Sequence, residues 1–155
     1  MATKTTTTAT ALRLLAHHGL TDWAFGYDNA VNRFGQTTYR TRKITVSQKT
    51  LAARTNAEVE QTLLHEVAHA LVGPGYGHGE VWLRTARRIG YHGSRCSSST
   101  PEVRDAVAQM AKWIGTCADC PVQVPRHRKP STKKMIHTVC QHKPGHGVIT
   151  WAAAR

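Results

Sequence analysis

Residues 63–82 read LLHEVAHALVGPGYGHGEVW, and the chemistry of the chain depends on this stretch. Two histidines, His65 and His69, lie four residues apart in an apolar run. Because residues four apart share one face of a helix, their imidazoles can approach a single ion. Glycines and a proline then interrupt the run on the way to a third histidine, His78. The stretch therefore predicts a helix, a sharp reversal and a metal site.

Glu66 follows the first of these histidines directly, so on a helix it projects about 100° to one side. This angle keeps the carboxylate off the metal but within reach of a water bound there. Catalytic zinc uses three protein ligands and leaves a fourth position for water. The predicted ligands of a catalytic zinc are His65, His69 and His78. Glu66 is the predicted general base that activates the zinc-bound water, and Glu80 and His92 are alternatives for the third ligand.

Periodicity and end signals predict the elements around this helix. Apolar residues recur at helical spacing from residue 57 to the glycine-rich break, and Thr55 or Asn56 can cap the start. Further helices are expected over residues 10–19, 80–89 and 101–113, and strands over residues 23–27 and 36–46.

The tail of the chain carries a second pattern of metal ligands. Cys117 and Cys120 stand at C-x2-C spacing, which suits a tetrahedral metal better than a disulfide. The favoured ligands of this structural zinc are Cys117, Cys120, His137 and Cys140, because the last two repeat the same spacing. His142 or His146 in place of His137 is the alternative. Cys96 is interpreted as an idle or buried thiol.

The chain is strongly basic. Its 155 residues include 21 Lys+Arg against 9 Asp+Glu, a formal net charge of +12. Residues 33–54, 84–95 and 126–134 are basic and contain no acid, which favours a polyanionic partner, either nucleic acid or an anionic membrane surface. The predicted phosphate contacts are Arg126, Arg128, Lys129, Lys133 and Lys134. Trp113 or Trp151 either stacks on unpaired bases or packs in the core.

Several features together resemble one family. They are Trp23, Arg33 with Gly35, Ile44–Ser47, His65-Glu66-x-x-His69, Gly77-His78-Gly79 with Trp82, and Ala86–Gly90. With these residues, the chain resembles the SprT-like family of zinc metallopeptidases, which are related to Spartan. The resemblance implies an α+β fold: a small zincin-like metallopeptidase domain, in which helices pack on a short antiparallel sheet, followed by a β-rich zinc ribbon. It also implies work on or near DNA, including DNA–protein crosslinks.

These observations predict the organisation of the chain. We expect a disordered Thr-rich tail over residues 1–9, a metallopeptidase domain over residues 10–114 and a basic zinc-ribbon module over residues 115–155. No run approaches the ~20 apolar residues of a membrane-spanning helix. The N-terminal sequence lacks the long apolar core of a signal peptide, so we expect an intracellular protein, cytoplasmic or at the nucleoid or nucleus. A transit peptide is the alternative.

The functional hypothesis is a zinc-dependent endopeptidase, acting as a monomer on proteins bound to DNA that is single-stranded or recognised without sequence specificity. Tyr76, Tyr91 and His92 are unranked candidates for stabilising the oxyanion. The alternatives are a non-catalytic DNA-binding zinc protein and a general intracellular zinc peptidase. Glu66 favours an enzyme, because a structural metal site has no use for an ionised carboxylate beside an open position.

Overall fold

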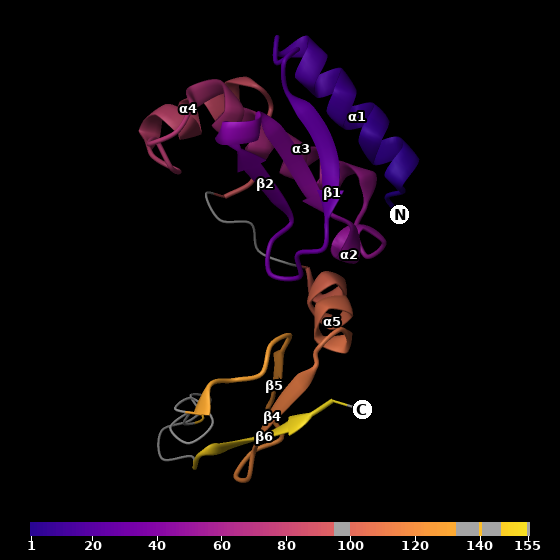
Figure 1. Ribbon diagram of the computed structural model, residues 1–155, viewed down its shortest axis with the longest axis vertical. Coiled ribbons are helices and arrows are strands. Elements are labelled where there is room, and N and C mark those ends of the chain that lie inside the picture. The colour runs from indigo at the N-terminus through magenta and orange to yellow at the C-terminus, as the bar shows by residue number, and fades with distance from the viewer. Residues whose placement is uncertain (95–99, 133–139, 141–146, 155) are drawn as a thin grey trace. The chain divides into compact units, whose positions relative to one another are not determined.

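The computed structural model describes residues 1–94, 100–132, 140 and 147–154, and the chain forms two compact units, residues 1–103 and 104–155 (Figure 1). The predicted boundary between residues 114 and 115 is wrong, since it falls inside a strand of the second unit. Lys112 explains the difference. Its N–H donates to the main-chain oxygen of Arg126, and its own oxygen accepts from Ala154 N–H, so the segment before the predicted boundary already belongs to the second unit.

The first unit contains a small sheet of three strands. They are β1 (Ala24–Asp28), β2 (Gly35–Thr38) and β3 (Lys43–Ser47), in the order β1-β3-β2. The pair β2 and β3 is antiparallel and is joined through the short 3-10 helix η1 (Tyr39–Thr41), whereas β1 runs parallel to β3. The sheet is therefore mixed, and the prediction of an antiparallel sheet is wrong in this respect. The reason is that the chain passes from β1 to β2 at the opposite edge of the sheet. It then turns back as β3, which lies between β1 and β2.

The helix predicted from the histidine pattern is α3 (Asn56–Val72). Thr55 caps its start: the Thr55 hydroxyl accepts from Glu58 N–H, and the Glu58 carboxylate accepts from Thr55 N–H. Gly73 ends it with a φ of 83°, a backbone conformation that disfavours residues with a Cβ. Val59, Leu63 and Val67 are almost fully buried along one face of α3. This face packs over the sheet, so the prediction of an amphipathic helix is confirmed.

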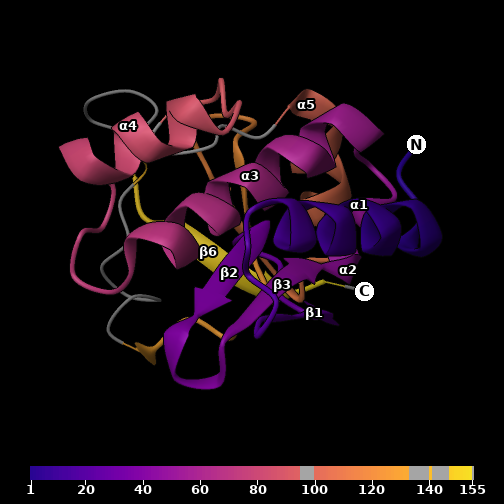
Figure 2. The ribbon, with the colours of Figure 1, turned by 90° about the horizontal axis from the view of Figure 1, so that it is seen from above.

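The N-terminal segment is the helix α1 (Lys4–His17), so the prediction of a disordered tail over residues 1–9 is wrong. Thr3 caps the helix in a reciprocal pair with Thr6. Thr7, Ala11 and Leu14 are buried at helical spacing, and α1 lies beside α3 (Figure 2). Threonine has a low helix propensity, but tertiary packing of one face overrides that local preference.

Two further helices complete the first unit. The short helix α2 (Gln48–Leu51) follows β3, and α4 (Glu80–Arg88) follows the glycine-rich loop after α3. Trp82 and Ala86 of α4 have no exposed surface and pack into the core against α3. The predicted helix over residues 80–89 is thereby confirmed to within one residue.

The second unit is an antiparallel sheet with a cysteine cluster. Its chain begins within α5 (Pro101–Gln109) and continues into the sheet. The strands are β4 (Trp113–Cys117), β5 (Gln123–Arg126) and β6 (Ile149–Ala153), in the order β5-β4-β6. The helix predicted over residues 101–113 is shorter than expected, because Trp113 belongs to β4. The fold class is α+β, as predicted. Across the described residues, no helix combines the length and apolar character needed to cross a membrane.

Candidate metal centre

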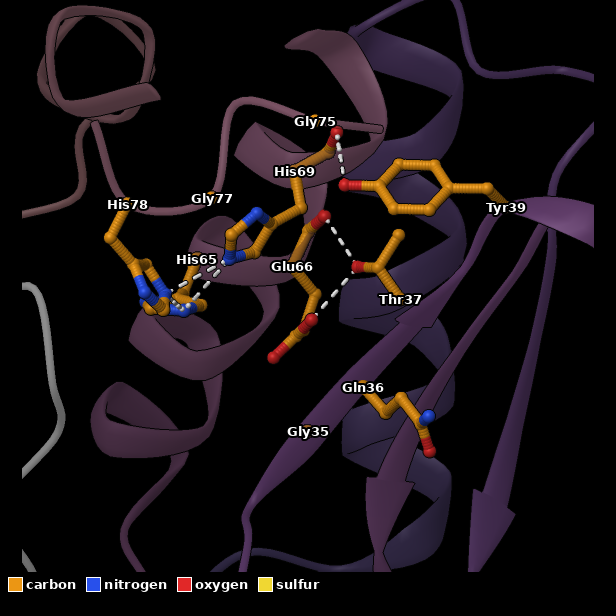
Figure 3. A pocket seen from close by; sticks show the side chains of 10 residues that line it. All are labelled: Gly35, Gln36, Thr37, Tyr39, His65, Glu66, His69, Gly75, Gly77 and His78. Carbon is orange, nitrogen blue, oxygen red and sulfur yellow. Dashed lines mark hydrogen bonds between the residues drawn. The ribbon is translucent and has the colours of Figure 1, made fainter. Parts of the chain in front are cut away.

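Three imidazoles converge where α3 meets the loop that follows it (Figure 3). The Nε2 atoms of His65 and His69 are 3.3 Å apart, and the Nε2 atom of His78 lies 2.9 Å from the first and 3.1 Å from the second. Nitrogen ligands of tetrahedral zinc, each about 2.0–2.1 Å from the ion, are roughly 3.3 Å from one another. The donor set and its spacing therefore fit zinc. Neither alternative ligand, Glu80 or His92, is part of this cluster.

The glycine-rich loop has the backbone that this convergence requires. Gly75 and Gly77 have φ values of 95° and 49°, in the region that side chains with a Cβ rarely adopt. Through these turns the chain reverses after α3 and returns His78 to the helix.

Burial keeps the helix imidazoles in the form that binds metal. Burial, followed by the neighbouring rings of the cluster, lowers the pKa of His65 and of His69 to about 4. At neutral pH both rings are consequently uncharged, and a nitrogen lone pair on each is available as a ligand.

Glu66 lies beside the cluster with only 7% of its surface exposed. Burial raises the pKa of Glu66 to about 7, although hydrogen bonding from Thr37 and the charge of Arg33 act in the opposite direction. The Thr37 hydroxyl donates toward Oε2 of Glu66 across 2.8 Å. The carboxyl group and the three histidines line an open cleft of about 410 Å³ between β2 and α3. A proton-accepting group and a set of metal ligands therefore share one solvent-accessible space.

Residues 16–102 match the SprT-like family, and they include the three histidines, Glu66 and all of α4. The match covers more than half of the chain. The chain belongs to the SprT-like family. No curated protein shows significant sequence similarity to it.

An aromatic wall supports the imidazoles of this SprT-like site. The Trp82 ring is 4.7 Å from the rings of both His65 and His78, and it stacks on that of His69 at 5.3 Å. Tyr91 contacts the same wall, with its ring 5.3 Å from that of His65. Packing against rigid rings restricts how the imidazoles can turn.

The candidates for oxyanion stabilisation occupy different positions relative to the cleft. Tyr91 is buried, and its hydroxyl donates to the main-chain oxygen of Ser94. Tyr76 is exposed in the loop after α3 and does not line the cleft. Tyr39 does line the cleft, and its hydroxyl donates to the main-chain oxygen of His69 at 3.3 Å. Tyr39 was not predicted as a residue of the cleft, because no sequence motif indicates that the residue after β2 lies against α3.

The cysteines of the second unit form a separate cluster. The Sγ atoms of Cys117, Cys120 and Cys140 lie within 4.8 Å of one another, and those of the last two are 3.6 Å apart. Thiolates bound to tetrahedral zinc, each about 2.3 Å from the ion, are roughly 3.8 Å apart. All three are free cysteines, and Asp119 N–H donates to the sulfur of Cys117 at 3.4 Å. The geometry is consistent with a zinc ribbon.

Several predicted site residues lie outside the described part of the chain. They are the candidates for the fourth ligand, His137, His142 and His146, together with Cys96, Lys133 and Lys134. The identity of the fourth ligand therefore stays a prediction. Among the described cations, Arg126, Arg128 and Lys129 are exposed on and after β5.

Proposed function

We propose that the protein is a zinc-dependent endopeptidase with Glu66 as its general base. The observation that carries this proposal is the convergence of three histidine Nε2 atoms beside a buried carboxyl group in one open cleft. A zinc ion bound by the histidines would act as a Lewis acid toward a peptide carbonyl.

The chain's own residues supply the proton transfers. Glu66 accepts a proton from the attacking water and returns it to the leaving amine. A carboxyl group with a pKa near neutrality suits both tasks, because it neither holds nor releases the proton too strongly. His65 and His69 are held by helix α3, whereas His78 depends on the glycine-rich loop.

The alternative of a purely structural histidine site is less favourable. A structural zinc is enclosed by four protein ligands, whereas this cluster has three among the described residues, beside an open cleft. Burying Glu66 also costs free energy that a structural role does not explain. The arrangement therefore supports an enzyme over a non-catalytic zinc protein.

Proteins bound to DNA are the proposed substrates. The net charge of +12 supports an acidic partner. In the second unit, the Arg126 guanidinium lies 5.8 Å from the Trp151 ring, and Lys129 Nζ lies 5.5 Å from the Trp113 ring. Cations beside half-buried indoles suit phosphates and unpaired bases without selecting a sequence. A general peptidase that does not engage DNA would not need this surface.

The test compares the parent with Glu66→Gln, which keeps the shape of the side chain but removes the base. We expect the variant to fold and to bind zinc as the parent does, while cleavage of a DNA-binding protein falls by at least about 100-fold. Zinc content, thermal unfolding and cleavage in the presence of single-stranded DNA are the measurements. A variant that cleaves as fast as the parent would exclude Glu66 as the base.

A further inference from the structure

The edge strand β2 lies directly against the side chain of Glu66. A Cβ added to Gly35 would come within 2.8 Å of both Cγ and Oε1 of Glu66, and within 3.0 Å of Cγ2 of Thr62. Such contacts are shorter than real Cβ atoms make, so a side chain at this position would displace Glu66. The bare backbone of β2 therefore forms one wall of the space that holds the carboxyl group.

Two residues along the strand, Thr37 adds a polar contact on the same side. Its Oγ1 lies 2.8 Å from Oε2 of Glu66 and 2.9 Å from the main-chain oxygen of Glu66 (Figure 3). The hydroxyl has one hydrogen, which it can donate to either oxygen by rotating about its C–O bond. One hydroxyl thus lies within hydrogen-bond distance of both the side chain and the backbone of the same residue.

The core holds the strand in this register. Gly35 pairs with Val46 and Thr37 pairs with Ile44 across the antiparallel ladder. Both β3 residues are 1% exposed. A shift of β2 by one residue would turn its side chains to the other face of the sheet. The pairing of β2 with the buried strand β3 therefore determines that the Thr37 side chain lies on the face toward Glu66.

We propose that Thr37 is a positioning residue that holds Oε2 of Glu66, so that Oε1 is the oxygen that exchanges the proton during peptide hydrolysis. This inference rests on the proposed peptidase function. A glutamate side chain has several rotamers, and proton transfer needs the accepting oxygen within about 2.6–3.2 Å of the donor. A hydroxyl that engages one carboxyl oxygen restricts the orientation of the other.

The first experiment measures zinc-loaded, full-length protein with a small unstructured peptide. Thr37→Val keeps the shape of the side chain and removes the hydroxyl, and we expect kcat to fall by about 10- to 100-fold with KM and zinc content unchanged. Thr37→Ser should recover most of the activity. Thr38→Val is the matched control, because its side chain points to the other face of the strand. If valine is not accepted at position 37, Thr37→Ala carries the same expectations.

A double-mutant cycle separates positioning from general stability. In a Glu66→Gln background, Thr37→Val should change the residual rate less than about twofold, because the group that it positions is already absent. A purely structural role would lower both rates equally.

A second readout needs neither metal nor activity. In metal-free protein labelled with ¹³C at the glutamate carboxyl carbons, Glu66 is assigned by the disappearance of its signal in Glu66→Gln. This signal should move in Thr37→Val and stay in place in Thr37→Ser and Thr38→Val. An unmoved signal, a kcat close to that of the parent, or a decrease that serine does not reverse would each overturn the inference. Equal cleavage by the parent and Glu66→Gln would instead refute the proposed function, and the NMR comparison would still test Thr37.

Discussion

At the scale of single residues, the three histidines of the cluster differ in what holds them in place. His65 and His69 lie four residues apart on α3, so the period of the helix sets their spacing. His78 depends on a loop whose glycines take positive φ values. The third ligand is therefore the one most sensitive to changes in the backbone around it.

Metal content tests the independence of the two clusters. The purified protein is expected to bind two zinc ions, because each cluster has its own ligands in its own unit. His78→Ala should loosen the first zinc and leave the second, and Cys117→Ser should do the reverse. Zinc titration with mass spectrometry of the native protein measures both. A single zinc that is absent from Cys117→Ser but retained in His69→Ala would contradict the histidine site.

Asp28 gives the first unit a predicted dependence on pH. Burial raises the pKa of Asp28, but hydrogen bonds from Thr45, Arg33 and Ala30 N–H outweigh it and hold the pKa below its ordinary value of 3.8. The pKa of Asp28 is therefore lower in the folded state than in the unfolded state. Ionised Asp28 stabilises the fold at pH values above its unfolded-state pKa, and this stabilisation disappears as the pH falls through its folded-state pKa. Urea unfolding between about pH 6 and about pH 2 should show this decrease. The decrease in the free energy of unfolding should be smaller in Asp28→Asn than in the parent. Equal pH profiles of the two proteins would refute the role of Asp28.

The clustering of the three histidines could be predicted from sequence, but their surroundings could not. The spacing of His65 and His69 follows from the period of one helix, so a local pattern is sufficient. Thr37 of β2 contacts Glu66, and Tyr39 of η1 contacts His69, across about thirty residues of sequence. Their proximity arises from how β2 pairs and how α3 packs on it, and no local spacing encodes that arrangement.

At the scale of elements, α1 is helical because of its packing, although its residues have a low helix propensity. Its consecutive threonines, read singly, favour extended or irregular backbone. The apolar positions of the segment, however, match one face of a helix that α3 covers. The mixed sheet could not be predicted for a related reason, because the pairing of β1 with β3 joins strands that are not consecutive.

Two leucines of α1 test whether the helix contributes to the fold. Leu14 is 4% exposed and Leu12 is 54% exposed on the same helix. Leu14→Ala should lower the free energy of unfolding by about 2–5 kcal/mol, because it leaves a cavity in the core. Leu12→Ala should change it by less than about 0.5 kcal/mol. Urea unfolding monitored by circular dichroism gives both values, and similar effects of the two substitutions would contradict the packing of α1.

At the scale of the whole molecule, the chain separates a histidine site from a cysteine site. Each unit has its own cluster of buried apolar residues. The family match covers residues 16–102 of the histidine unit and ends before Cys117. The α+β class and the ribbon could be predicted from sequence. The boundary between the units could not be predicted from sequence. The hydrogen bonds that join Lys112 to the second unit are to Arg126 and Ala154, which lie far from it in the chain.

Charge in the second unit should control activity on DNA-bound substrates. Neutralising the basic residues on and after β5 should weaken DNA binding and flatten its dependence on salt, because each phosphate that the protein neutralises adds close to one unit of log–log slope. The residues to neutralise are Arg126, Arg128, Lys129, Lys133 and Lys134. Cleavage of a small peptide should stay nearly unchanged, since the histidine site belongs to the other unit. An equal decrease of both activities would assign these residues a structural role.

The indole of Trp82 makes the metal site observable by light. It is fully enclosed, and its ring packs against all three imidazoles. Charge on a neighbouring imidazole quenches indole emission, and a paramagnetic or coloured ion such as Co²⁺ quenches it by energy transfer. Binding of Co²⁺ to the histidine cluster should therefore quench the share of the emission that Trp82 contributes among the chain's four tryptophans, without an attached dye.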